Sequence, residues 1–384
     1  MKQGRPLPEL AAELERQANA KQDYLAEAEA MCLRSNGVSR LVLDEAGQDY
    51  QLAEIAHGQI ADYLGIPKAF YDRLRGETST LRIPVDGVNG HDDLRGSYEE
   101  PDTPLFDVMV NTLMMGKGTE RRLVRTLDGK ARAFLSDSFN PDIDNIDVFT
   151  VVARILLEAG LSPETVVSCE VTERRLYLKV ISPALEAIIR LGNGNGYLKE
   201  PQVVRAGFVL MNSEVGLGSL IVQQYVCVLV CTNGLIREDA YRQRHLGKTL
   251  QSDEDGGIYR SDTRVADARA RLLKLRDHIA DALDETRFRE FTARMQESTE
   301  VRITGSVEKG VEATARRFGL IQHEKDAVLR NLIEGADLSM WGLSNAVTAA
   351  ASTLKDYDRA TELEAIGGRI LSLTPSEARD ILAA

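Results

Sequence analysis

The segment with the clearest potential for chemistry is ERRLYLKV, residues 173–180. Successive side chains of a strand point to opposite sides, so a strand here places Arg175, Tyr177 and Lys179 on one face. Cations on such a face bind phosphates, and a ring between them can stack under a base. The pattern predicts a sheet face that binds nucleic acid, with single-stranded DNA favoured. The alternative interpretation is a solvated sheet face without a ligand.

Two further basic segments extend this prediction. The first is the expected hairpin RRLVRTLDGKARAFLSD, with its turn at Asp128-Gly129, and a strand there puts alternate residues of KARAF on one face. Its candidate nucleic-acid-binding residues are Arg121, Arg122, Arg125, Lys130, Arg132 and Phe134. The second segment follows CTNGLI and contributes Arg242, Arg244 and His245, although a lone histidine among arginines is more often an ordinary exposed side chain.

The stretch MNSEVGLGSL, residues 211–220, is an unusual connection between two apolar runs. Its glycines precede a strand, whereas glycine motifs that hold phosphates open a helix, so a nucleotide cradle is not favoured. Glycines in a long hairpin loop supply positive φ, and Asn or Ser side chains bond nearby backbone amides. That interpretation leaves the glutamate unexplained, so a ligand role for the loop stays open. The residues concerned are Asn212, Ser213, Glu214, Gly216 and Gly218.

An acidic stretch, SDSFNPDIDNIDVF, carries Asp137, Asp142, Asp144 and Asp147. Its spacing lacks the central glycine and the final glutamate of a calcium loop. Capping of the following helix by Asp144 or Asn145 is the favoured interpretation, and we expect no metal site. A metal-dependent nuclease that uses these carboxylates is an alternative.

The segment HGQIADYLGIPKAFYDRL, residues 57–74, has the coarse pattern of a helix-turn-helix, with an alanine and a glycine four residues apart. In that hypothesis Lys68, Tyr71 and Arg73 lie near a DNA groove. The alternative is a helical hairpin whose residues serve packing alone.

Composition limits these hypotheses. With 384 residues, 43% hydrophobic and 28% charged, the chain is expected to fold into two or three packed units. A net charge of -12 argues against coating nucleic acid with the whole surface, although a local basic face remains compatible with it. The absence of a long apolar run and of a signal-peptide core predicts a cytoplasmic protein without membrane contact.

Catalytic signatures are missing. The four cysteines lack zinc-ligand spacing and are expected to be small buried hydrophobes. Five scattered histidines and the lack of a nucleophile motif give no acid-base pair to nominate. We therefore expect a protein that is not an enzyme and needs no cofactor.

Periodicity predicts an α+β fold, with an antiparallel sheet built from sequential hairpins between helical N- and C-terminal regions. We expect helix over residues 7–33 and over about 53–76 with a break at Gly65 and Pro67. The predicted regions are a helical one at 1–115 with a mobile loop at 77–107, a sheet core at 116–260 and a helical one at 261–384. The long C-terminal helices also favour, as an alternative, a homo-oligomeric assembly or interaction protein.

Several of these segments together resemble one known family. In order they are LGIPKAFYDRL, RTLDGKARAFLSDSFNPDIDN, VTERRLYLKV, NSEVGLGSL and VCTNGLI. This set, which spans nearly all of residues 1–260, resembles the phage/plasmid-like family called domain of unknown function 932. The resemblance implies bacterial mobile elements as the context and no established activity. Members more usually carry a basic residue and a tyrosine where this chain has Ser138 and Phe139, and no catalytic residue carries over.

Overall fold

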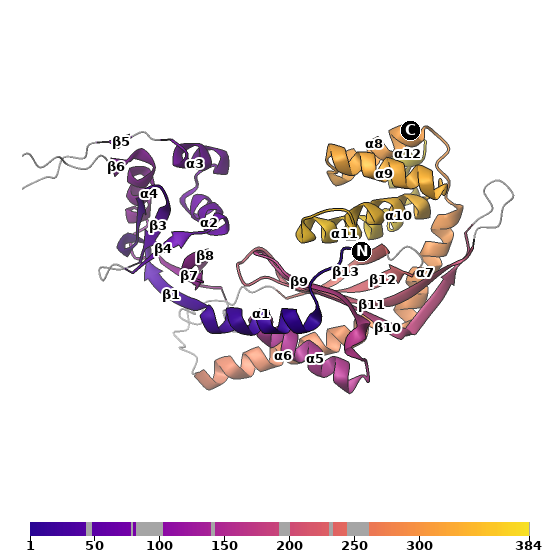
Figure 1. The fold of residues 1–384 in the computed structure, drawn as a ribbon, viewed down its shortest axis with the longest axis horizontal. Coiled ribbons are helices and arrows are strands. Elements are labelled where there is room, and N and C mark those ends of the chain that lie inside the picture. Colours follow the sequence, from indigo (N-terminus) through magenta and orange to yellow (C-terminus); the bar gives the residue numbers. More distant parts are fainter. Residues whose placement is uncertain are drawn as a thin grey trace, which may run out of the picture. The chain divides into compact units, whose positions relative to one another are not determined.

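A computed structural model describes most of the chain, which forms two compact units. Unit 1 comprises the described residues of 1–15, 141–245 and 259–384, and unit 2 those of 16–140. Both units combine helices with sheets whose strands pair mostly antiparallel, so the predicted α+β class is correct (Figure 1). The described residues are 1–43, 48–77, 80–81, 103–139, 143–191, 200–229, 233–243 and 261–383.

Unit 2 contains a six-stranded sheet in which β4 and β8 pair in parallel and the other neighbours are antiparallel. Asp128 and Gly129 both have positive φ, 51° and 73°, which is the geometry of a tight hairpin turn and confirms the predicted one. In spatial order the strands are β1 (Gln22–Glu27), β7 (Arg121–Leu127), β8 (Lys130–Ser136), β4 (Asp49–Leu52), β3 (Ser39–Val42) and β2 (Cys32–Ser35).

Three helices of the described residues contribute to the apolar core of unit 2, and two short strands form a separate pair. The predicted break between the first two helices is confirmed, because Gly65 ends the first one with φ 71°. Tyr71 lies in the core with no exposed surface, so its predicted position near a DNA groove is wrong. The elements are α2 (Glu54–Leu64), α3 (Lys68–Arg75), α4 (Leu105–Met115), β5 (Thr80–Leu81), β6 (Thr103–Pro104) and the 3₁₀ turn η1 (Ala28–Ala30).

Unit 1 contains a five-stranded antiparallel sheet in which every strand pairs with its neighbour in sequence. This order confirms the prediction of sequential hairpins. The strands are β9 (Val166–Val171), β10 (Leu176–Ile189), β11 (Gln202–Asn212), β12 (Leu220–Val228) and β13 (Asn233–Gln243), with the 3₁₀ turn η2 (Pro163–Thr165) before β9.

Helices cover both faces of the unit 1 sheet (Figure 1). On one face Leu176 and Leu178 pack with apolar residues of α5 and α6, whereas on the other face Tyr177 packs with Tyr357 of α11. Helices α8 to α12 share a further apolar core and belong to unit 1. The helices are α1 (Leu7–Ala20), α5 (Asn145–Glu158), α6 (Ser261–Ala282), α7 (Glu285–Glu300), α8 (Val307–Phe318), α9 (Gln322–Gly335), α10 (Met340–Ala351), α11 (Tyr357–Leu371) and α12 (Pro375–Leu382).

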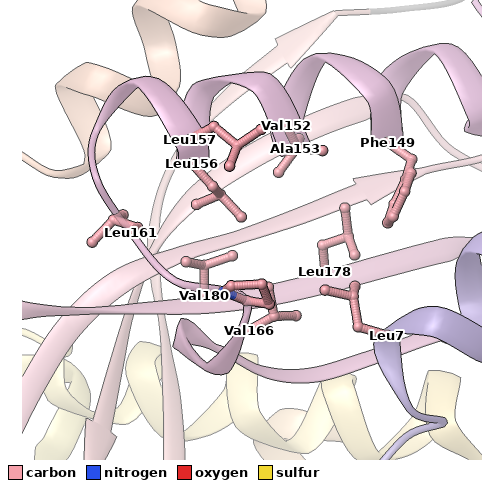
Figure 2. Close-up of a pocket in the computed structure, with 11 residues that line it drawn as sticks. Leu7, Phe149, Val152, Ala153, Leu156, Leu157, Leu161, Val166, Leu178 and Val180 are labelled. Carbon is pink, nitrogen blue, oxygen red and sulfur yellow. The ribbon is translucent and has the colours of Figure 1, made fainter.

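A small apolar cavity lies below α5 and has a volume of about 170 Å³ (Figure 2). Phe149, Val152 and Leu156 of the helix face Leu178 and Val180 of β10 across it. Its lining offers no polar group to orient a ligand. None of the helices described here has the length and apolar character that a bilayer crossing requires.

Two predictions about organisation are wrong. The helix expected over residues 7–33 ends at Ala20, because the following segment pairs with β7 as strand β1. The hairpin β7–β8 joins β1 and β4 instead of the later hairpins, so the predicted single sheet core at 116–260 is divided between the two units. Most of the loop predicted at 77–107 lies outside the described residues.

Candidate nucleic-acid interface

The basic face predicted on β10 exists but is buried. Arg175, Tyr177 and Lys179 do alternate with apolar residues, yet Tyr177 and Lys179 are 1% and 0% exposed. The Tyr177 hydroxyl donates to Asp358 Oδ1 at 2.6 Å, and Lys179 Nζ lies 2.7 Å from Glu364 Oε2. Helix α11 thus covers this face and supplies its counter-charges, so the prediction that the face is free for nucleic acid is wrong.

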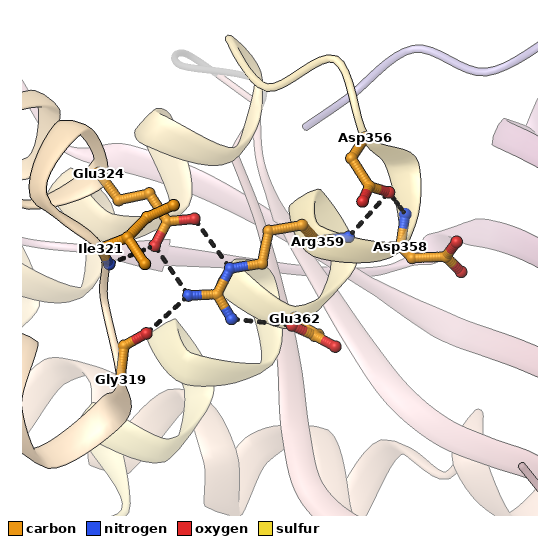
Figure 3. A network of polar contacts seen from close by, with 7 residues as sticks. All are labelled: Gly319, Ile321, Glu324, Asp356, Asp358, Arg359 and Glu362. Carbon is orange, nitrogen blue, oxygen red and sulfur yellow. Dashed lines mark hydrogen bonds and ion pairs between the residues drawn. The ribbon is translucent and has the colours of Figure 1, made fainter. Parts of the chain in front are cut away.

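Helix α11 is held over the sheet by a polar network at its amino end (Figure 3). Asp356 caps the helix by accepting from the backbone N–H groups of Asp358 and Arg359. The Arg359 guanidinium donates to both oxygens of Glu324 in α9, at 2.8 and 2.7 Å. Burial alone would raise the pKa of Glu324, but the hydrogen bonds from Arg359 and from the Ile321 N–H lower it. This carboxylate therefore stays charged and fixes α11 to α9.

The loop after β11 is part of the scaffold. Glu214, which sequence reasoning left unexplained, accepts from the Asn145 N–H at 2.6 Å and so satisfies the first turn of α5. Asn212 donates to the Asn145 side-chain oxygen at 2.9 Å, and Ser213 donates to the Arg174 carbonyl at 2.8 Å. These bonds use the loop's polar groups internally and give no support to a ligand role.

The loop glycines serve two different purposes. Gly216 has φ 71°, as expected for a glycine that permits a turn. Gly218 does not have positive φ, and that part of the prediction is wrong. A Cβ on Gly218 would lie 2.9 Å from Arg175 Nε, so this glycine makes room for the guanidinium, whose Nη2 donates to the Leu217 carbonyl at 2.6 Å.

The β7–β8 hairpin departs from the simple alternation that was predicted. Arg125 and the next residue of β7 face Ala133 and Ala131, so Arg132 is the extra residue of a β-bulge. The bulge reverses the alternation, and Lys130 is exposed whereas Phe134 lies in the core. Arg132 is 5% exposed and Arg125 is fully buried, where it forms an ion pair with Asp23. Lys130, Arg132 and Phe134 therefore do not form one binding face.

The hairpin nevertheless brings two of the predicted residues together. The Arg122 guanidinium lies 5.1 Å from the centre of the Phe134 ring and 4.4 Å from that of Tyr63, a residue of α2. Lys117 Nζ lies 4.8 Å from the Tyr63 ring centre. We call Tyr63, Lys117, Arg122 and Phe134 the Tyr63 cluster. Tyr63 was missed in the sequence because it lies 54 and 59 residues before its cationic partners Lys117 and Arg122.

The electrostatics of this cluster follow from its partial burial. Desolvation lowers the pKa of Arg122, and the nearby carboxylates of Glu120 and Asp137 oppose that effect. Burial, assisted by Glu120, raises the pKa of Tyr63 to about 12, so the phenol stays neutral. Arg122 Nε is buried and has no hydrogen-bond partner among the described residues. The cluster thus combines two cations, two rings and an unused donor.

Of the other predicted residues, the structure describes some, and others lie outside the described residues. Arg121 is half-buried on β7 and Arg242 is exposed on β13, whereas Arg244, His245 and Asp142 lie outside the described residues. Asp144 caps α5 in a capping box with Asp147, as favoured. In the described part of the chain no three His, Cys, Asp or Glu side chains are grouped to hold a metal ion, so the nuclease alternative gains no site there.

No protein-family model, curated protein or solved structure matches the chain. The resemblance to the domain of unknown function 932 family therefore stays a prediction.

Proposed function

We propose that this chain binds single-stranded nucleic acid through unit 2 and that the Tyr63 cluster is the contact site. The observation that carries the proposal is the position of the Arg122 guanidinium, which lies 4.4 Å from the Tyr63 ring centre and 5.1 Å from the Phe134 ring centre and forms no ion pair with a carboxylate among the described residues. A guanidinium fixed in this way presents a planar fork that matches a phosphate. Lys117 is exposed beside the Tyr63 ring and offers a second cation.

A single strand suits this cluster better than a duplex does. Tyr63 is half-buried, and the proposal places an unstacked base against the accessible part of its side chain. Base stacking on an aromatic side chain contributes about 1–3 kcal/mol and needs no particular sequence. In an acidic chain only such local cations offset phosphate charge, so affinity should fall steeply with salt.

The biological setting of the proposal comes from the resemblance. A phage or plasmid protein that binds single strands in the bacterial cytoplasm would serve replication or recombination, for example in annealing. This role requires neither catalysis nor a cofactor. In this proposal nucleic acid binds to unit 2, and the buried face of β10 in unit 1 has only a structural role.

The test compares binding of labelled single- and double-stranded oligonucleotides at several salt concentrations. We expect the wild type to favour single strands and the Lys117→Ala/Arg122→Ala variant to bind them at least about tenfold more weakly. Its salt slope should be smaller by about 1.4, because two phosphate contacts are lost at about 0.7 each. The matched control is Arg287→Ala/Arg289→Ala, which removes two exposed cations from α7 in unit 1. Equal affinity of wild type and the Lys117/Arg122 variant would refute the proposal.

The ring is tested separately from the cations. Tyr63→Leu removes the stacking surface, whereas Tyr63→Phe keeps it and removes only the hydroxyl. We expect the leucine variant to lose about 1–3 kcal/mol of binding free energy and the phenylalanine variant to bind like wild type. Equal loss in both variants would show that the ring does not stack on a base.

A further inference from the structure

Unit 2 also contains a pocket of about 530 Å³. This volume lies in the range of about 300–1,000 Å³ that is typical of small-molecule sites. The pocket lies between the β2–β3 hairpin, strand β4, the start of α2, the end of α3 and the start of α4. Ser35, Ser39, Gln51, Leu52, His57 and Phe106 are among its lining residues.

Neutral hydrogen-bonding groups from four elements line this pocket. The hydroxyls of Ser35 and Ser39 lie 3.3 Å apart across the β2–β3 hairpin, and the Gln51 side chain comes from β4. His57 is 3% exposed, and its Nδ1 lies 2.9 Å from the Tyr71 hydroxyl, which fixes the ring. Burial lowers the pKa of His57 to about 4, so the imidazole is neutral at physiological pH. Hydroxyl, amide and neutral imidazole can each donate or accept a hydrogen bond.

The charged groups of the lining are held in ion pairs, one within the lining and one with Arg73 outside it. Arg75 lies 2.9 Å from Glu54 Oε1, and Glu77 lies 3.8 Å from Arg73. A ligand with several charges would therefore find no matching excess of opposite charge. Phe106, Leu52 and Pro104 belong to the apolar part of the lining. The lining combines apolar walls with polar groups that match the edges of a neutral heterocycle.

From this lining we infer that the pocket binds a nucleoside, with the base against Phe106 and Leu52 and its polar edge at Gln51, Ser35 and Ser39. The shared chemistry has two sources, a free nucleoside or an unpaired base of a strand. The inference stands on the pocket alone and does not rest on the Tyr63 cluster, which lies outside its lining. Neither site requires the other.

The test titrates adenosine, guanosine, cytidine and uridine into the full chain by calorimetry, with ribose as a sugar control. Gln51→Leu removes the amide, and Val38→Trp places a large ring at the mouth, where Val38 is 45% exposed. Leu25→Trp is the matched control, because Leu25 is 43% exposed on β1 and does not line the pocket. Far-UV circular dichroism and thermal midpoints establish that each variant folds.

We expect saturable binding of at least one nucleoside to wild type and to Leu25→Trp, with at least about tenfold weaker binding to the two pocket variants. A short oligonucleotide that binds more tightly than its nucleoside, and loses this advantage in Val38→Trp, would identify an unpaired base of a strand as the ligand. Equal affinities of oligonucleotide and nucleoside would identify the free nucleoside as the ligand. Binding of ribose alone, no saturable nucleoside binding, or equal binding by Val38→Trp would overturn the inference. The Lys117→Ala/Arg122→Ala variant should bind nucleosides like wild type, so failure of one proposal is distinguishable from failure of the other.

Discussion

Lys179 and Glu364 form an ion pair whose two side chains have no exposed surface. Removing one partner of such a pair leaves an uncompensated buried charge, which costs about 3–5 kcal/mol. We therefore expect Glu364→Gln to lower the free energy of unfolding by at least about 3 kcal/mol, measured by urea unfolding. The double variant Lys179→Met/Glu364→Leu should recover most of that loss, because it removes both charges. A loss below about 1 kcal/mol for the single variant would contradict this account.

His57 makes the stability of unit 2 depend on pH. Burial lowers its pKa from 6.5 to about 4, so the unfolded chain binds a proton at a higher pH than the folded chain does. The contribution of the neutral His57 side chain to the free energy of unfolding is fully present above pH 6.5 and is lost as the pH falls from there toward 4. At pH 5 we expect a loss of about 2 kcal/mol relative to pH 7, measured by urea unfolding followed by circular dichroism. In His57→Gln, which keeps a polar partner for Tyr71, this part of the pH dependence should disappear.

At the scale of elements, Glu214 is the N-terminal partner of α5. Glu214→Ala leaves the Asn145 N–H without its acceptor, and loss of a helix cap costs about 0.5–2 kcal/mol. Glu214→Gln keeps an acceptor oxygen, so the glutamine variant should be the more stable of the two. Thermal unfolding of both variants checks the order. The reverse order would mean that Glu214 stabilises unit 1 by some other contact.

Sequence separation explains which predictions of these elements could succeed. The turn at Asp128-Gly129, the cap at Asp144 and the alternation along β10 depend on residues that are close in sequence, and all three were predicted correctly. The cover over β10 depends on contacts 181 and 182 residues apart, from Tyr177 to Asp358 and from Lys179 to Thr361. Periodicity carries no information on such pairings. The bulge at Arg132 was equally invisible, because one extra residue changes the face of a strand without a sequence signature.

The candidate sites show the same limit. Two of the predicted nucleic-acid-binding residues, Arg122 and Phe134, meet in the Tyr63 cluster, yet the ring that joins them comes from α2. The pocket gathers single residues from several short elements, none of which forms a motif. The sequence shows which residues could bind a ligand, whereas the tertiary fold determines which of them lie close together.

At the scale of the whole molecule, the two units have separate apolar cores, and this predicts two unfolding transitions. The single tryptophan, Trp341, is buried in unit 1, where its Nε1 donates to Gln202 at 2.9 Å. Tryptophan fluorescence therefore reports on unit 1, whereas far-UV circular dichroism reports on both units.

A matched pair of core variants tests this independence. Ile60 in unit 2 and Ile370 in unit 1 are both fully buried, and an isoleucine-to-alanine change in a core costs about 2–5 kcal/mol. We expect Ile370→Ala to lower the denaturant midpoint seen by fluorescence, and Ile60→Ala to leave that midpoint unchanged while an earlier transition appears in circular dichroism. If both variants shift the fluorescence midpoint equally, the two units unfold as one cooperative body. In that case a substitution in unit 2 also changes the stability of unit 1, and each binding test of the Tyr63 cluster or the pocket needs the stability of its variant measured beside its affinity.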